Sequence, residues 1–112
     1  MSGMRVMMAN SPRAYREVIS AALKELRPNL QIFTAKPEDL DEEFRRLSPH
    51  LVVCNWVTEL VEREAHCWIE LYPDGASESV VSLDGQKITC PEMDLEALLS
   101  VLDEAERLQR PA

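Results

Sequence analysis

Asn55 is the residue whose position in the sequence most strongly suggests a functional site. It follows the short apolar run Leu51 to Cys54, which comes after a helix-like segment. Apolar runs that alternate with amphipathic helices predict a parallel sheet, and such sheets carry functional groups at the carboxyl ends of their strands. An amide there can form hydrogen bonds, but it cannot accept a phosphoryl group, act as a general base or hold a hard metal ion strongly. An amide at the end of this strand therefore favours a role in binding over a role in catalysis.

The thiols are the other groups that could react. Cys54, Cys67 and Cys90 are odd in number and lack Cys-x-x-Cys spacing, which is typical of reduced thiols. A thiolate nucleophile needs a neighbouring base or positive charge. Nothing basic flanks Cys54, and Cys90 has only Lys87 three positions earlier. Together with His66 the thiols could bind zinc by ligand type, but their spacing lacks the paired form. We expect buried, inert thiols and no metal.

The chain offers no glycine-rich loop for a phosphate-bearing cofactor. Its only glycines are Gly3, Gly75 and Gly85, so neither a dinucleotide-binding nor a P-loop fingerprint can be built. The loop at residues 10–12 is short and includes a proline, which lacks an amide donor. A flavin site is therefore not expected either, and we expect no cofactor.

Length and charge narrow the class of protein. The chain has 112 residues, a length that suits a single domain over residues 1–112. Its formal net charge is −8. Its basic residues are scattered among acids, whereas nucleic-acid binding needs clustered Lys and Arg. We expect binding to neither nucleic acid nor an anionic membrane.

The apolar runs are too short to cross a bilayer and no secretory signal is evident, so we expect a soluble, cytoplasmic protein.

Hydrophobic periodicity divides the chain into alternating strands and helices. Strands are predicted at residues 4–9, 30–35, within 49–55 and at 66–72, with a hairpin formed by 79–83 and 86–89. Helices are predicted from Pro12 to before Pro28, from Pro37 to Leu47, at 58–64 and after Pro91. Ser11 is the predicted N-cap of the first helix, and residues 73–75 are predicted to form a turn.

The hairpin interrupts the alternation of strands and helices. No helical stripe separates the fourth predicted strand from residues 79–83, although a parallel neighbour would need a crossover of about a dozen residues or more. This part of the sheet is therefore predicted to be antiparallel. The expected fold class is α/β, with a mostly parallel central sheet in which a β-hairpin replaces one crossover helix.

Three local matches resemble the receiver domain of two-component response regulators. Residues 5–11, followed by Arg16 and Glu17, look like the first strand, acidic pair and first helix of a receiver. Residues 49–55 look like the segment that carries the phosphoacceptor, and 90–99 are similar to the opening of the last helix. The resemblance implies a three-layer, flavodoxin-like sandwich, and it is good over residues 4–56 and 88–108 but poor between them.

The resemblance also implies that the phosphorylation site is degenerate. A receiver uses two adjacent acids to hold Mg²⁺, an Asp to accept phosphate and a Lys to neutralise it. The matching positions here are Asn10, Ser11, Asn55 and Cys90, none of which carries a carboxylate or an ammonium group. We therefore expect a pseudo-receiver that cannot be phosphorylated in the usual way and is not an enzyme.

A receiver without phosphorylation would work by protein contact. The resemblance implies that residues 66–108 form the output surface, so we expect this region to bind an unidentified protein partner, with Trp68 and Tyr72 as candidate anchors. Burial of these aromatic side chains in the core is the competing interpretation, and their size favours it because large aromatic residues in small domains are mostly buried. A homodimer is plausible because the remodelled sheet edge would invite a second protomer. We expect the protein to act in bacterial signal transduction.

Two other functions stay open at this point. One is a small-ligand sensor in which Asn10, Ser11, Asn55 and Cys90 line a neutral pocket at the strand ends. The other is an enzyme that uses Cys54 or Cys90 as a nucleophile.

Overall fold

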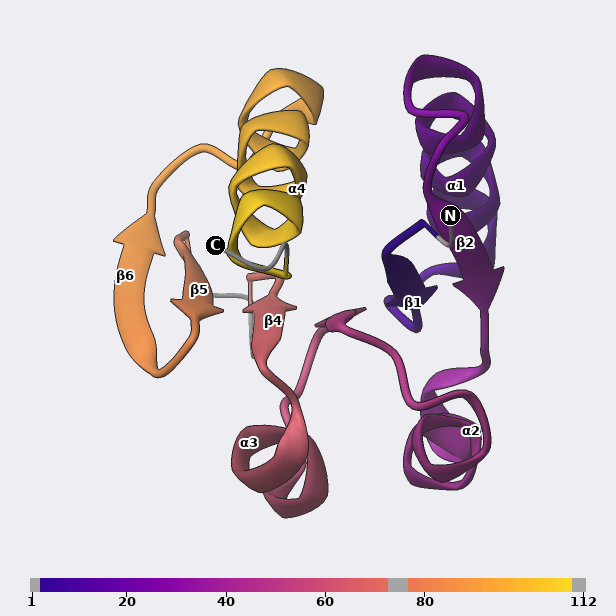
Figure 1. Cartoon of the computed structure of the whole chain (residues 1–112), viewed down its shortest axis with the longest axis vertical. Coiled ribbons are helices and arrows are strands. Elements are labelled where there is room, and N and C mark those ends of the chain that lie inside the picture. Colours follow the sequence, from indigo (N-terminus) through magenta and orange to yellow (C-terminus); the bar gives the residue numbers. More distant parts are fainter. Residues whose placement is uncertain (1–2, 73–76, 110–112) are drawn as a thin grey trace.

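A computed structural model describes residues 3–72 and 77–109, and the turn predicted at residues 73–75 lies outside these ranges. The described part is mixed α/β (Figure 1). In chain order its elements are β1 (Arg5–Met8), α1 (Arg13–Leu26), β2 (Gln31–Thr34), the 3₁₀ helix η1 (Pro37–Asp39), α2 (Leu40–Leu47), β3 (Leu51–Cys54), α3 (Glu59–Glu64), β4 (Cys67–Glu70), β5 (Ser79–Leu83), β6 (Gln86–Cys90) and α4 (Leu95–Gln109).

The strands form one six-stranded sheet in the order β2-β1-β3-β4-β5-β6. The first four in this order are parallel, as the alternation of apolar runs and helices predicts. The β4–β5 and β5–β6 pairs are antiparallel, which confirms the predicted hairpin and the missing crossover helix. Asp84 and Gly85 form the hairpin turn, both with positive φ (53° and 91°), and Asp-Gly is a preferred pair for such turns.

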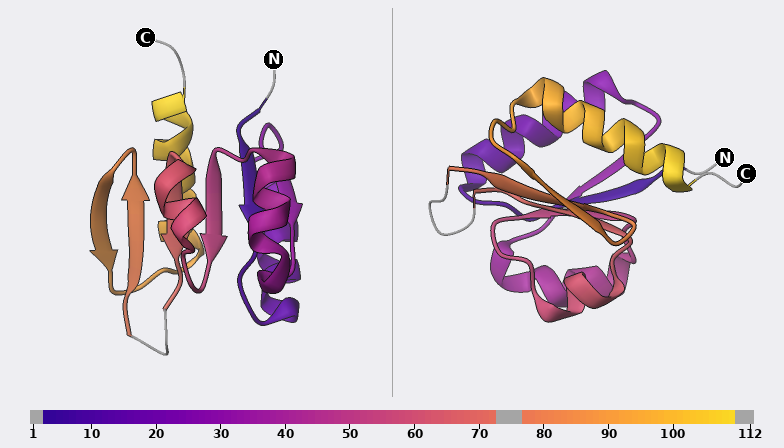
Figure 2. Two further views of the ribbon diagram at one scale, coloured as in Figure 1. Left: turned by 90° about the horizontal axis from the view of Figure 1, so that it is seen from below. Right: turned by 90° about the vertical axis from the view of Figure 1, so that its left-hand side faces the viewer.

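Helices cover both faces of the sheet (Figure 2). Helices α1 and α4 pack on one face, and α2 and α3 pack on the other. Because side chains alternate along a strand, β1 sends Val6 and Met8 into the core under α1 and α4, while Met7 enters the core on the other side. Strand β3 divides its side chains in the same way, and all four of its residues are buried. The central strands are therefore apolar throughout.

The start of α1 differs from the prediction in one respect. Pro12 occupies the N-cap position and no side chain caps the helix, so the prediction that Ser11 is the N-cap is wrong. The physical reason is that Pro12 is extended (φ −78°, ψ 168°), so the helix begins one residue later than predicted, at Arg13, and Ser11 precedes the cap position. The short helix α3 is capped as usual, since the Thr58 hydroxyl accepts from the Val61 N–H.

Within residues 3–72 and 77–109, no helix is both long and apolar enough to span a membrane.

Candidate functional site

Three of the predicted site residues meet at the carboxyl ends of β1 and β3. The side-chain Oδ1 of Asn55 accepts a hydrogen bond from the Ser11 backbone N–H at 2.5 Å. The Nδ2 of Asn55 donates to the carbonyl of Leu71, which follows β4, at 3.1 Å. Asn55 therefore uses both ends of its amide to hold the β1–α1 loop and the end of β4 together.

Asn10 lies next to Ser11 but is fully buried. Neither its Oδ1 nor its Nδ2 has a hydrogen-bond partner among the residues that the structure describes. Its backbone carbonyl accepts from Nη1 of Arg16 at 3.1 Å. A buried amide without partners costs stability of about 1–3 kcal/mol, so packing alone does not account for an amide at this position.

Cys90 does not join this group. It ends β6, which is separated from β3 by β4 and β5. Strands lie about 4.8 Å apart, so three steps across the sheet put Cys90 roughly 14 Å from the end of β3. Its Sγ lies 3.3 Å from the carbonyl oxygen of Glu92, within its own loop. The structure thus brings together three of the four residues expected to line a neutral pocket.

The buried thiols have little access to thiolate chemistry. Cys54 is buried at the end of β3, and burial, followed by the nearby charge of Glu70, raises its pKa to about 12. Cys67 is buried as well, and burial raises the pKa of its thiol. Cys54 pairs with Glu70 whereas Cys67 pairs with Leu51, so the two thiols lie at opposite ends of adjacent strands. This arrangement does not form the zinc site considered from ligand type, and no group of three potential metal ligands occurs among the described residues.

The two predicted interface anchors have different environments. Trp68 is only 3% exposed and packs in the core beneath α2 and α3, with Nζ of Lys87 5.7 Å from its ring centroid. Burial in the core therefore holds for Trp68, and its side chain is not available as an interface anchor. Tyr72 is partly exposed, but its hydroxyl accepts a hydrogen bond from the Met93 N–H. The most exposed tryptophan is Trp56, at 59%.

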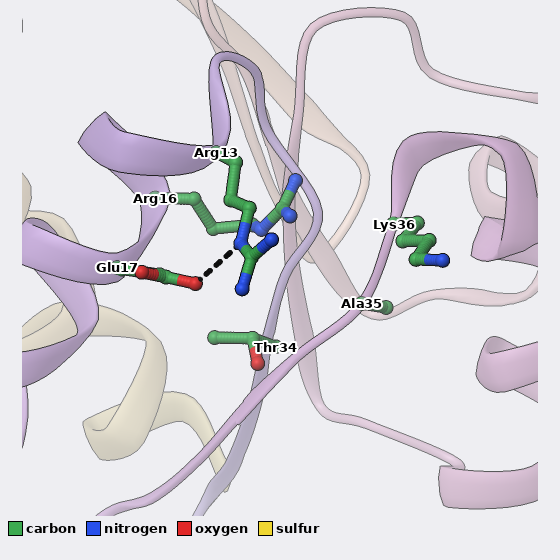
Figure 3. Close-up of a pocket in the computed structure, with 6 residues that line it drawn as sticks. All are labelled: Arg13, Arg16, Glu17, Thr34, Ala35 and Lys36. Atoms are coloured by element: carbon green, nitrogen blue, oxygen red, sulfur yellow. Dashed lines mark hydrogen bonds and ion pairs between the residues drawn. The ribbon is translucent and has the colours of Figure 1, made fainter.

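A pocket that the sequence did not predict lies beside the start of α1 (Figure 3). Its volume is about 440 Å³. Two short segments line it, one from the first turns of α1 and one from the end of β2: Arg13, Arg16, Glu17, Thr34, Ala35 and Lys36. Three of these side chains are cationic and one is a carboxylate, in a chain whose net charge is −8.

Two arginines dominate the electrostatics of this pocket. Arg13 donates through Nε to Glu17 at 2.7 Å, and this exposed pair is the chief cause of the lowered pKa of Glu17. Arg16 is 7% exposed, and its Nε has no hydrogen-bond partner among the described residues. The sequence signal that could have revealed the pocket was the first turn of α1, which contains no acidic residue although acids are favoured there.

Comparisons with protein-family models, with curated proteins and with solved structures found no match to this chain.

Proposed function

We propose that this protein is a receiver-like, non-catalytic regulatory module that acts by protein contact. The order β2-β1-β3-β4-β5 is the flavodoxin-like strand order, which supports the likeness, although β5 runs antiparallel. At the position of the receiver's phosphoacceptor, Asn55 makes two structural hydrogen bonds. An amide used in this way links loops and offers no acceptor for a phosphoryl group.

The single observation that carries the proposal is the exposure of β6. It is an edge strand, paired only with β5, and none of its residues is buried. Ile88 at its centre is 57% exposed. A long exposed edge with an apolar side chain is a template for pairing with another strand, and proteins usually block such edges with charges, prolines or covering elements. The one charged residue of β6, Lys87, is paired with Glu62 at 2.8 Å.

The partner that fits this edge is a second copy of the chain. In an antiparallel pair centred on Ile88, the two isoleucines face each other and Lys87 faces Thr89 of the partner subunit. Like charges directly opposite each other would destabilise the pair, and this register avoids them. Strand β6 contains no acidic residue, although the chain as a whole carries a net charge of −8, so two copies of the strand can pair without placing carboxylates opposite each other. The result is a two-fold symmetric dimer with a continuous sheet.

Sedimentation equilibrium of the wild type and two variants tests this proposal. Ile88→Lys places like charges opposite each other at the centre of the interface, and we expect it to be monomeric at concentrations where the wild type is dimeric. Val18→Lys is the matched control, because Val18 is an apolar residue on α1 that is at least as exposed as Ile88. A wild-type chain that stays monomeric up to high micromolar concentration, or an Ile88→Lys dimer, would contradict the proposal.

A small-ligand sensor is the second candidate function. The observation that favours it is Asn10, whose buried amide has no described partner at the β1/β3 switch point, where α/β sheets of this order bind ligands. Thermal-shift screening of metabolites with the wild type and Asn10→Ala separates this function from the first. A ligand that stabilises only the wild type would support it.

A further inference from the structure

We propose that the pocket beside α1, between Arg13, Arg16 and the end of β2, binds the phosphate group of a small anionic ligand. The proposal is independent of the β6 interface, because the pocket lies at the other side of the sheet, next to the opposite edge strand.

The guanidinium of Arg16 is the main evidence. Arg16 is 93% buried, yet within the described part of the chain no carboxylate lies within ion-pairing distance of it, and Nη1 bonds only to the Asn10 carbonyl. Its Nε has no partner in this part of the chain. Burying a cation without a counter-charge is costly. The nearest carboxylate in the pocket, that of Glu17, acts on Arg16 only through space and is bonded to Arg13. An anion in the adjoining pocket would bring a negative charge into direct contact with the Arg16 guanidinium.

The start of α1 adds a second, independent reason. The first turn of a helix carries partial positive charge, so acids stabilise it and cations destabilise it. Helix α1 has no acid in its first turn and no capping side chain, and it begins with Arg13. This arrangement is unfavourable for the protein alone. It becomes favourable when an anion binds, because the helix dipole and the two arginines attract it.

The geometry of the side chains agrees with this assignment (Figure 3). Arg13 and Arg16 both line the pocket, and in Figure 3 their guanidinium groups project toward the same region, whereas the ammonium of Lys36 points away from it. Arg13 uses Nε for Glu17, which leaves its two terminal nitrogens as donors. Two guanidinium groups with several donors suit the oxygens of a phosphate group better than a single point charge does. We assign Arg13 and Arg16 as the ligand contacts, and Lys36 as a flanking charge.

The size of the pocket indicates the class of ligand. A volume of about 440 Å³ lies in the range of small-molecule sites and holds more than one phosphate group. A phosphate monoester of a small organic molecule and free phosphate share the chemistry that the arginines recognise. Titrations with glycerol 3-phosphate and with inorganic phosphate distinguish a monoester ligand from free phosphate. A third titration, with acetate, tests whether a carboxylate binds equally well.

Each titration is followed by NMR, at constant ionic strength, through the backbone amides of α1 and the Nε–H signals of the arginines. We expect saturable binding of phosphate at millimolar concentrations, with the largest changes at Arg13, Arg16 and Thr34, and weaker binding of acetate. Tighter binding of glycerol 3-phosphate than of phosphate would identify a monoester site, and the reverse would identify a site for the free ion.

Variants make the test specific. Arg13→Gln removes a side chain that is 80% exposed, so the fold does not depend on it, and we expect phosphate binding to weaken by at least about tenfold. Arg16→Lys keeps the charge but loses the fork of donors, and we expect a similar loss. Arg63→Gln is the matched control, since Arg63 is an exposed, ion-paired arginine on α3. Unsaturable shifts, equal binding of acetate, or equal weakening by Arg63→Gln would overturn the proposal.

Discussion

Asn55 is the side chain that links two loops at the carboxyl ends of the strands. Its amide accepts from the Ser11 N–H and donates to the Leu71 carbonyl, so both polar atoms serve the structure. A carboxylate would accept the first bond but could not donate the second. Its negative charge would instead face the carbonyl oxygen of Leu71.

Asn55→Asp is therefore expected to destabilise the protein by about 1–3 kcal/mol, although Asp is the residue type that the proposed likeness to a receiver would call for. Urea unfolding measures the change. Gln31→Glu, which adds the same charge at an exposed position of β2, away from the proposed interface, is the control and should change stability by less than about 0.5 kcal/mol. An Asn55→Asp variant as stable as the wild type would show that the Leu71 bond contributes little.

His50 makes the stability of the fold sensitive to pH. Its Nδ1 accepts a hydrogen bond from the Arg5 N–H at 2.9 Å, which requires an unprotonated nitrogen. Burial, then the charge of Arg5, then that of His66 lower the pKa of His50 below its ordinary value of 6.5.

As the pH falls through 6.5, the unfolded chain takes up a proton at His50 that the folded chain does not. The free energy of unfolding should therefore decrease on acidification below this pH. In His50→Asn, whose side-chain oxygen can accept the same bond, this decrease should be smaller. Urea unfolding of the wild type and His50→Asn between pH 5 and pH 7.5 checks the expectation. Identical pH profiles for the wild type and His50→Asn would contradict it.

At the scale of elements, strands and helices were predictable because their signals are local. The apolar runs of β1 and β3 and the helical stripe of α1 were located from hydrophobic spacing, and the Asp84-Gly85 pair located the hairpin. Which helices cover Trp68 was not predictable, although its burial was the interpretation that its size favoured. Alternation along a strand separates two sets of side chains, but it does not say which helix covers which set.

The pocket was not predictable for a related reason. The sequence pattern places Arg16 on the exposed face of an amphipathic helix. In the structure it is buried, where α1 approaches the loop after β1. Likewise, the distance between Cys90 and Asn55 depends on two strands that intervene in the sheet and not on the sequence of either site.

The β5–β6 hairpin depends on its turn. Gly85 has φ 91°, a conformation that side chains disfavour, although a Cβ there would meet no atom within 4 Å. Gly85→Ala should thus destabilise the protein through the backbone alone, by about 1–2 kcal/mol. Thermal and urea unfolding measure the loss, with Gln86→Ala as a neighbouring control. A neutral Gly85→Ala would mean that the turn adopts another conformation at no cost.

At the scale of the whole molecule, the sheet has two edges of unequal exposure. Strand β2 ends one side, where Ile32 is buried beneath α1 and Phe33 is partly buried. Strand β6 ends the other side with no buried residue. Helices α1 and α4 share one face of the sheet, and α2 and α3 share the other, so neither pair extends over β6 as fully as over the central strands (Figure 2). The proposed dimer covers the edge that the chain itself leaves open.

Amide hydrogen exchange at low and high protein concentration tests pairing through β6 most directly. Every second amide of β6 points away from β5, and these amides should exchange quickly in the dilute protein. We predict that they become protected as concentration rises, while the amides of β2 at the opposite edge keep their rates. Exchange of β6 that is equally fast at both concentrations, or protection that appears at β2 instead, would contradict the account.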